Sequence, residues 1–399
     1  MRGEAAAAVR RMLRGKRYGI LGAPGDPLAQ PARSRLAWAH NTAQAVQDLG
    51  CDALLAGGVA GLPIPFDNRE GLASLRRLVA GLHDLPGGYD LRATHDLPAR
   101  FGALPPGRWV LDYELPRAIL PYCGIIHTRH AGVLAAALER GLPAIYEDHG
   151  EPQEKDGEAV ARLLAPASPP RLAVAASAAL RDRLAAAGVP AERIIVLGPA
   201  IHPAALARQQ AAAASIRRSL LHGMARHLFV QAGGMAEEGG IEAVLEAAAT
   251  LRDAVFVQLG GEAPAQAALR DRVVERGLPN VIVAGALPQR EARAFQQAAD
   301  AVIVACAPGR LAAPLRFPEA LAAGAPIAAA AIPALEGWGD RGLAIRFHDP
   351  GRPETLAGAL EALVAAHPWQ AGGVAANRAE AERLGWQARQ RVVFERLVA

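Results

Sequence analysis

Apolar, strand-like runs alternate with stretches rich in Ala, Leu and Arg along almost the whole chain. Such alternation is typical of parallel sheets whose two faces are covered by the helices that connect the strands. Helices fit between several runs, notably over 131–140 and 178–187, whereas 63–106 is rich in Gly and Pro and receives no assignment. In the first half, strands are predicted to begin at Arg17, Cys51, Arg108, Cys123, Pro143, Leu172 and Ile194.

The strand-helix rhythm starts again after a helical spacer at about 204–222. The second series of predicted strands begins at His227, Ala254, Asn280, Ala301, Ala325 and Leu343. We therefore expect an α/β protein with two Rossmann-like, doubly wound domains, 1–202 and 203–384, of about 200 residues each. Ligands of such sheets bind at the carboxyl ends of the strands, here facing a cleft between the domains.

Composition favours a soluble globular protein, because 51% of the 399 residues are hydrophobic and 21% are charged. The cysteines Cys51, Cys123 and Cys306 lack metal-ligand spacing, which predicts no metal site and favours a reducing cytoplasm. No apolar run reaches the ~20 residues of a membrane span. With a net charge of +4 and no basic residues interleaved with aromatics, nucleic-acid binding is disfavoured.

The amino end carries a basic cluster with apolar residues at helical spacing. The basic residues are Arg10, Arg11, Arg14, Lys16 and Arg17, and the apolar ones are Ala5, Val9, Met12 and Leu13. Two interpretations stay open. The segment is a solvated basic helix that leads into the first strand, or it makes peripheral contact with the anionic inner face of a membrane.

Two predicted strands run directly into glycine-rich turns. The first ends in GILGAPGDP, where Gly22 and Gly25 allow close approach to an anion or serve packing alone. The first strand of the second series ends in QAGGMAEEGG, with Gly233 and Gly234 at the strand end and a helix opening near Gly240. Backbone amides there are suited to hold a phosphate without any side chain.

The stretch PLRFPEALAAGAPIAAAA places a single carboxylate, Glu319, in an otherwise Ala-rich segment. Pro318 suits the first turn of a helix, Gly324 suits its end, and Pro326–Ala331 is typical of a short buried strand. By this pattern alone Glu319 is a partner for the helix dipole.

The order of several motifs resembles the retaining family 4 glycosyltransferases, which have the GT-B fold. VFVQLGGEAPAQAALRDRVVERGLPNVIVAGAL, then FPEALAAGAPIAAA, is similar to their nucleotide-sugar domain. IIHTRHAGVLAAALERGLPAIYEDHG and LAVAASAALRDRLAAAGVPAERIIVLGPAIHP are similar to their acceptor-side domain. The resemblance implies that a terminal helix, 385–399, packs back on the first domain, with Val392, Val393 and Leu397 as its buried stripe.

The resemblance also implies roles for particular residues. Glu319 would bind the nucleotide ribose, because an ionised carboxylate accepts from both hydroxyls. His149 would approach the transferred sugar, with the capping of a turn as the alternative. Arg316 would contact the diphosphate in the spacing Pro314, Arg316, Glu319, with a plain surface charge as the alternative. The nucleotide-sugar contacts expected besides Glu319 are Gly22, Gly233, Gly234, Leu287, Pro314 and Leu315. The neighbours Glu147 and Asp148 are interpreted as solvated acids, with acceptor contact as the alternative.

The sequence departs from the family pattern where the donor diphosphate would be held. Leu311 stands where many members have a further glutamate, and Gly234 and Gly239 stand where they have an Arg and a Lys. The resemblance implies a sugar transfer from a nucleotide-sugar donor to a glycan, lipid or small molecule, with no metal and no cofactor. Two alternatives remain: a catalytically degenerate protein that binds a sugar nucleotide or a partner, and a GT-B enzyme of another type, such as an epimerase.

Overall fold

The computed structural model describes residues 4–24, 26–28, 34–58, 69–95, 105, 107–150, 157–222, 225–235 and 240–399. The chain divides into two compact units. Unit 1 comprises Met1–Gly198 and Trp386–Ala399, and unit 2 comprises Pro199–Gly385. The sequence places the corresponding boundaries after residues 202 and 384.

Unit 1 contains a seven-stranded parallel sheet in the order β3-β2-β1-β4-β5-β6-β7, so the strand order reverses between β1 and β4. Its strands are β1 (Arg17–Leu21), β2 (Ala53–Gly58), β3 (Asp90–Thr94), β4 (Cys123–Thr128), β5 (Ala144–Asp148), β6 (Arg171–Ala175) and β7 (Ile194–Val196). Its helices are α1 (Glu4–Leu13), α2 (Ser34–Asp48), α3 (Arg69–His83), η2 (Val110–Ile119), η3 (Leu120–Tyr122), α4 (Ala131–Glu139), α5 (Gly157–Leu164), α6 (Ala178–Ala186), η5 (Ala191–Arg193) and α14 (Trp386–Val398).

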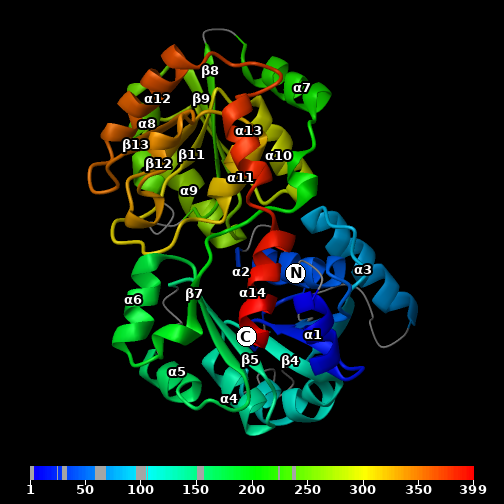
Figure 1. Ribbon diagram of the computed structural model, residues 1–399. Coiled ribbons are helices and arrows are strands. Elements are labelled where there is room, and N and C mark those ends of the chain that lie inside the picture. Colours follow the sequence, from blue (N-terminus) through cyan, green and yellow to red (C-terminus); the bar gives the residue numbers. More distant parts are fainter. Residues whose placement is uncertain are drawn as a thin grey trace. The chain divides into compact units, whose positions relative to one another are not determined.

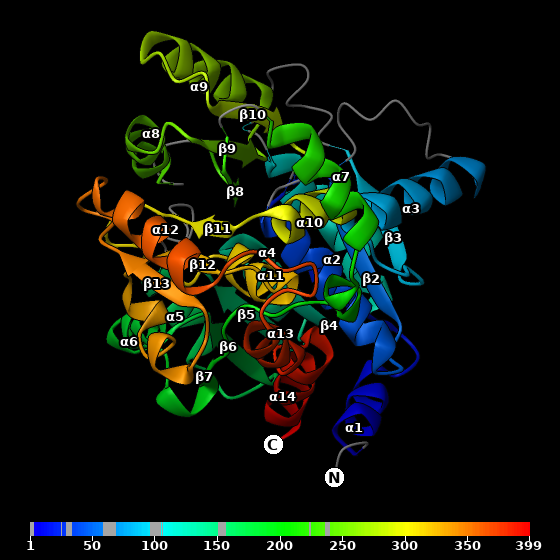
Figure 2. The same ribbon diagram turned by 90° about the horizontal axis from the view of Figure 1, so that it is seen from above.

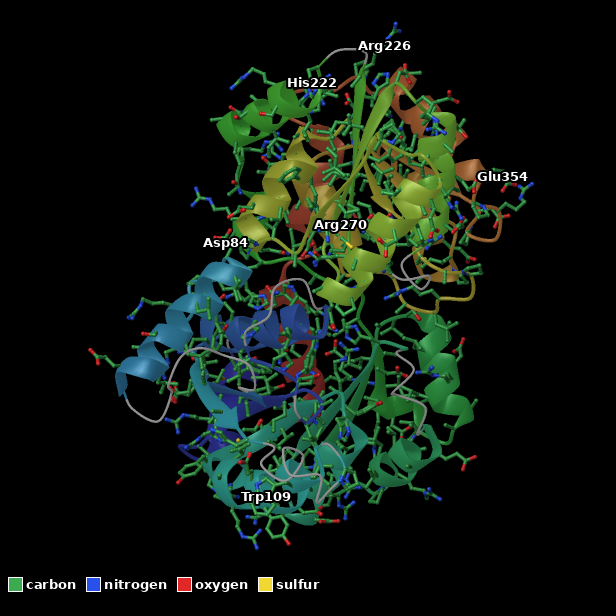
Figure 3. All side chains as sticks on the ribbon, turned by 180° about the vertical axis from the view of Figure 1, so that it is seen from behind. Asp84, Trp109, His222, Arg226, Arg270 and Glu354 are labelled. Atoms are coloured by element: carbon green, nitrogen blue, oxygen red, sulfur yellow. The ribbon has the colours of Figure 1, made fainter. Side chains whose placement is uncertain are left out.

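The strand predicted from Arg108 is wrong, because that segment forms the π-helical η2. Helical neighbours stabilise it: Arg108 Nε donates to Asp112 Oδ2 at 2.5 Å, and Trp109, labelled in Figure 3, stacks on Tyr113 with ring centroids 4.4 Å apart. Both pairs are four residues apart, a spacing that brings side chains into contact on a helix, whereas on a strand such residues lie about 13 Å apart. The short edge strand β3 is an addition, in the stretch left unassigned from the sequence.

Unit 2 contains a six-stranded parallel sheet in the order β10-β9-β8-β11-β12-β13, which reverses between β8 and β11. Every strand predicted for this half is present: β8 (His227–Ala232), β9 (Ala254–Leu259), β10 (Val281–Gly285), β11 (Ala301–Val304), β12 (Ile327–Ala330) and β13 (Ile345–His348). The helices are η6 (Pro203–Leu206), α7 (Gln210–Leu220), α8 (Ile241–Thr250), α9 (Ala263–Glu275), α10 (Gln289–Ala298), α11 (Arg316–Ala323), η8 (Pro333–Leu335), η9 (Gly339–Arg341), α12 (Thr355–Ala366) and α13 (Ala375–Glu382).

Helices cover both faces of the sheet in unit 2 (Figure 1). Leu228 and Val230 of β8 pack in one apolar core with residues of α10, α11 and α13, whereas Phe229 packs in the other with α8, α9 and α12. Neighbouring residues of a strand point to opposite faces, so the apolar run Leu228–Val230 of β8 supplies both cores.

The terminal helix α14 belongs to unit 1, where it lies beside α1 (Figures 1 and 2) and also contacts α2 and β6. Its apolar buried residues include Val393, Phe394 and Leu397. Val392 was expected in this stripe but is 40% exposed. Phe394, one position after Val393, supplies the contact instead, and its ring lies 5.7 Å from that of Tyr18.

Candidate functional site

In unit 2, the chain passes close to itself where the strand order reverses. Gly240 precedes α8 with φ 68°, and a Cβ at this position would lie 2.7 Å from the backbone nitrogen of Cys306, just after β11. Only glycine combines this conformation with this approach. The turn after β8 and the loop after β11 therefore meet at the reversal point, where doubly wound sheets bind their ligands.

Glu319 lies in the first turn of α11, on the chain that follows β11. Gly324 ends this helix with φ 72°, and the buried strand β12 follows, as the sequence predicts. Glu319 Oε2 accepts from Arg316 Nη1 at 2.9 Å, and Glu319 Oε1 accepts from Gln289 Nε2. The side chain of Glu319 is 17% exposed and that of Arg316 is 15% exposed.

The guanidinium of Arg316, which was expected to contact the diphosphate, is ion-paired with Glu319. Arg316 Nη1 also lies 3.4 Å from Gln289 Oε1, so the guanidinium contacts both neighbours. Each carboxylate oxygen can accept more than one hydrogen bond, which leaves Glu319 able to receive hydroxyl donors as well. Arg316, Gln289 and Glu319 thus form one polar group at the start of α11, which we call the α11 triad.

Gln289 was missed by the sequence reasoning. It is the first residue of α10, two positions after Leu287, and a glutamine at a helix start is an ordinary surface residue by pattern. Its contact with Glu319 joins residues 30 positions apart. Only the approach of α10 to α11 makes it part of the triad.

The other residues expected to contact the nucleotide-sugar occupy turns and loop ends of unit 2. Gly233 follows β8 with φ 155°, and no atom lies within 4 Å of a Cβ built there; Gly234 is exposed. Leu287 is partly buried and packs against the apolar core that contains residues of α10, α11 and α13. Leu315 precedes α11 with no side-chain cap, and the Pro314 carbonyl accepts from Phe317 N at 3.0 Å. Gly239 lies outside the described residues.

In unit 1, Gly22 follows β1, next to the point where the strand order reverses. Asp26 closes this turn, because its Oδ2 accepts from Ala23 N at 2.9 Å and would lie 2.6 Å from a Cβ at Gly22. A carboxylate of the chain therefore occupies one amide that an anion would need. Gly25 lies outside the described residues.

His149 follows β5 and joins a buried polar cluster centred on Glu147. His149 Nε2 lies 2.6 Å from Glu147 Oε1, and His127 Nε2 lies 3.0 Å from Glu147 Oε2. Arg389 of α14 donates to the same carboxylate from its two terminal guanidinium nitrogens, Nη2 to Oε1 at 2.6 Å and Nη1 to Oε2 at 3.3 Å. The carboxylate of Glu147 is fully buried.

The cluster continues from His127 to α14. His127 Nδ1 lies 3.1 Å from the Tyr18 hydroxyl, and Gln390 Nε2 donates to that hydroxyl at 3.1 Å. We call the residues Tyr18, His127, Glu147, His149, Arg389 and Gln390 the Glu147 cluster. They come from β1, β4, β5 with its following residue, and α14.

The charges in the Glu147 cluster are set by burial and by Arg389. Burial raises the pKa of Glu147, but Arg389 and the two histidine hydrogen bonds outweigh it and hold the pKa well below its ordinary value. Burial, together with Arg129, lowers the pKa of His149, and burial lowers the pKa of His127. At neutral pH the cluster therefore pairs one carboxylate with one guanidinium and holds neutral histidines.

The interpretation of Glu147 and Asp148 as solvated acids is wrong. Glu147 is 0% exposed and Asp148 is 1% exposed. Asp148 accepts from Arg183 Nη2 at 2.6 and 2.7 Å with its two oxygens, and Asp148 Oδ1 also accepts from Gly150 N at 2.8 Å. Partners that are distant in sequence compensate both charges, and the local pattern YEDHG gives no sign of them.

The expected basic helix at the amino end is α1, and part of it is packed instead of solvated. Val9 and Leu13 of α1 are buried, and Arg10 donates to the carbonyls of Leu49 and Gly50. Arg17, beyond this helix, opens β1 and pairs with Asp90 at 2.5 Å. Among the helices that the structure describes, none combines the length and apolarity needed to cross a bilayer.

His149 belongs to unit 1, and the α11 triad belongs to unit 2. His149 directly follows β5, and α10 and α11, which carry the triad, begin on the chain segments that follow β10 and β11. Their meeting across one cleft stays a prediction.

Residues 226–366 match the family model described as glycosyl transferases group 1. No curated protein matches the sequence. Among solved structures, HepE of Anabaena in complex with UDP and glucose is 16% identical, with a TM-score of 0.69 over 96% of this chain and 100% of that chain. Sucrose-phosphate synthase of Thermosynechococcus elongatus is 16% identical, with a TM-score of 0.71 over 96% and 98%.

A third solved structure has the same architecture. The UDP-forming alpha,alpha-trehalose-phosphate synthase of Burkholderia xenovorans, in complex with glucose-6-phosphate, is 14% identical, with a TM-score of 0.64 over 96% of this chain and 100% of that chain. The resemblance to group 1 glycosyltransferases and the GT-B fold, both expected from the sequence, are confirmed.

Proposed function

From the premise that residues 226–366 match the group 1 glycosyltransferases and that the chain has the GT-B fold, we propose that this protein transfers a sugar from a nucleotide-sugar donor to a glycan, lipid or small-molecule acceptor, with retention of configuration. The α11 triad carries the proposal. Its carboxylate, Glu319, is ion-paired at the start of the helix that follows β11, one of the two strands between which the strand order of unit 2 reverses. Of the similar structures, one is a complex with UDP and glucose and another is a complex with UDP-glucose.

The triad suits a nucleotide in two ways. Glu319 accepts from the ribose hydroxyls, and such bonds to a charged group are worth about 1.5–3 kcal/mol each. Arg316 faces the diphosphate, whose negative charge grows as the sugar leaves. The uncapped first turn of α11 adds partial positive charge at the same place. This arrangement needs no metal ion and no further cofactor, which is part of the proposal.

His149 supplies the contact to the transferred sugar from unit 1 in this proposal. Because the ring is neutral at ordinary pH, it meets the sugar as a hydrogen-bonding group and not as a cation. Peripheral contact with a membrane would place a lipid acceptor within reach.

Calorimetric titration of nucleoside diphosphates and their sugars into the purified protein tests the proposal. We expect one nucleotide to bind, and Glu319→Gln to weaken it roughly tenfold or more. Glu380→Gln is the matched control, because Glu380 is also a part-buried, ion-paired acid of unit 2 but lies on α13. No binding by the wild type, or equal losses in both variants, would contradict the assignment of the site.

A second function is favoured by one observation, the uncharged positions Gly234, Gly239 and Leu311. A degenerate protein that binds a sugar nucleotide without using it would need fewer charges at the diphosphate. Incubation of the wild type with the bound sugar nucleotide and cell-extract acceptors separates the two functions. Release of the nucleoside diphosphate supports transfer, and binding without any release supports the degenerate protein.

A further inference from the structure

Arg389 lies on the last helix, yet its guanidinium donates hydrogen bonds to the carboxylate of Glu147 on β5. It lies on α14, 242 positions from Glu147, and its side chain is only 5% exposed. We propose that Arg389 is a positioning residue for His149: acting through Glu147, it fixes the His149 ring as the neutral tautomer that carries its proton on Nε2. The relevance of this to catalysis rests on the proposed function, in which His149 meets the transferred sugar.

The hydrogen-bond directions follow from which atoms can donate. An ionised carboxylate only accepts, so His149 Nε2 and His127 Nε2 must both donate to Glu147. A neutral His127 then accepts at Nδ1 from the Tyr18 hydroxyl, which in turn accepts from Gln390 Nε2. Arg389 and Gln390 anchor this chain of bonds from adjacent positions of α14. Each assignment requires that Glu147 keep its negative charge.

Arg389 is the group that keeps Glu147 charged. A buried carboxylate without a partner takes up a proton or draws one onto a neighbouring base, because an uncompensated charge is costly away from water. The groups that face it are His127 from β4, His149, Arg389 from α14 and, beyond His127, Tyr18 from β1; Arg129 faces His149. Arg389 is the only guanidinium among the described residues that bonds Glu147 directly. Without it, a proton would move to a histidine.

The position of the His149 ring and its protonation are set by different residues, Trp38 for the position and Arg389, through Glu147, for the protonation. The Trp38 ring meets His149 edge-on, with centroids 6.4 Å apart, and limits where the ring can lie. Glu147 and Arg389 decide which nitrogen carries the proton and keep the ring uncharged. Because a hydrogen bond to a sugar hydroxyl depends on the tautomer, this choice decides how His149 can contact a donor.

Histidine ¹⁵N NMR of the full-length protein tests the proposal without any substrate. The His149 signal is assigned by its loss in His149→Gln. In the wild type at pH 7 we expect the neutral Nε2–H pattern. In Arg389→Met we expect the pattern of a protonated ring at His149 or His127 and a rise of the histidine pKa by more than one unit. Arg389→Lys keeps the charge and should restore the neutral pattern.

Arg183→Met is the matched control, because it breaks the ion pair of the adjacent Asp148 and leaves Glu147 with its partner. Its His149 signal should match the wild type. A folded Arg389→Met protein with an unchanged Nε2–H signal would overturn the proposal. If that variant does not fold, Glu147→Gln carries the test: His149 should then populate both tautomers, and a pure Nε2–H signal would overturn the proposal equally.

Kinetics connects the positioning role to the proposed transfer. Arg389→Met should lower kcat about as much as His149→Gln does, and the double variant should lose little more, while nucleotide affinity measured by calorimetry stays within twofold. Additive losses in the double variant would contradict the inference. If the wild type transfers no sugar at all, the proposed function fails. The NMR experiment uses no substrate, so it still tests whether Arg389 fixes the tautomer of His149.

Discussion

Arg316 and Glu319 lie three residues apart and form an ion pair, so neither acts alone in the α11 triad. The charge of Arg316 is expected to matter more during transfer than in the resting complex, because negative charge builds on the departing diphosphate. We predict that Arg316→Ala lowers turnover by about 100-fold and lowers nucleotide affinity by less than tenfold. Steady-state kinetics and calorimetry on the same preparation measure the two effects.

Arg310→Ala is the control for this prediction, since Arg310 bonds the nearby carbonyl of Ala312 and not the triad. It should leave both quantities within about twofold of the wild type. An Arg316→Ala protein that binds and turns over as well as the wild type would show that Arg316 does no more than pair with Glu319.

At the scale of elements, the start of α8 depends on glycine at position 240. A side chain there would adopt an unfavourable φ and meet Cys306 N at 2.7 Å. We predict that Gly240→Ala lowers the free energy of unfolding by about 2–4 kcal/mol. In contrast, Gly358 lies inside α12 with no atom within 4 Å of a Cβ. Gly358→Ala should raise the free energy of unfolding by about 0.4–1 kcal/mol.

Urea unfolding of both variants tests this pair, with the wild type as reference. Equal effects of the two substitutions would show that helix propensity, and not the close approach to Cys306, decides the stability at position 240. The same comparison reports on the reversal point of the sheet in unit 2, because Gly240 is where α8 meets the end of β11.

The docking of α14 on unit 1 is carried by its apolar stripe. Phe394 is fully buried and Val392 is 40% exposed, although the two are only two positions apart. We predict that Phe394→Ala lowers the free energy of unfolding by about 3–5 kcal/mol and that Val392→Ala changes it by less than about 0.5 kcal/mol. Thermal unfolding followed by circular dichroism distinguishes them. Equal losses would mean that the helix packs through a different face.

At the scale of the whole molecule, buried neutral histidines make stability depend on pH. Burial lowers the pKa of His40 to about 4 and that of His348 to about 4. In the unfolded chain these rings bind protons below about pH 6.5, whereas in the folded protein they bind them only near pH 4. The stability that each contributes is present above pH 6.5 and is lost as pH falls toward 4.

We predict that the free energy of unfolding falls by about 2 kcal/mol between pH 7 and pH 5 for His40 alone, since one pKa unit corresponds to about 1.4 kcal/mol. His40→Gln should reduce this pH slope, whatever it does to stability at pH 7. Urea titrations across this range give the slope, and an unchanged slope in His40→Gln would contradict the prediction.

The sequence alone was sufficient for features that depend on near neighbours. The period of apolar residues predicts the six strands of unit 2, and Pro318 and Gly324 mark the bounds of α11 around Glu319, because helix ends and buried strands follow from local geometry. Where local signals conflict, as in the apolar run from Arg108, contacts between residues four apart decide for a helix.

Contacts between distant residues were decided only by the tertiary structure. Glu147 and Asp148 are acids in a short polar pattern that usually marks a surface, yet both are buried because Arg389 and Arg183 arrive from other parts of the chain. Gln289 joins Glu319 for the same reason. The partner of a buried charge is fixed by how the chain returns on itself, and no periodicity around the acid records that path.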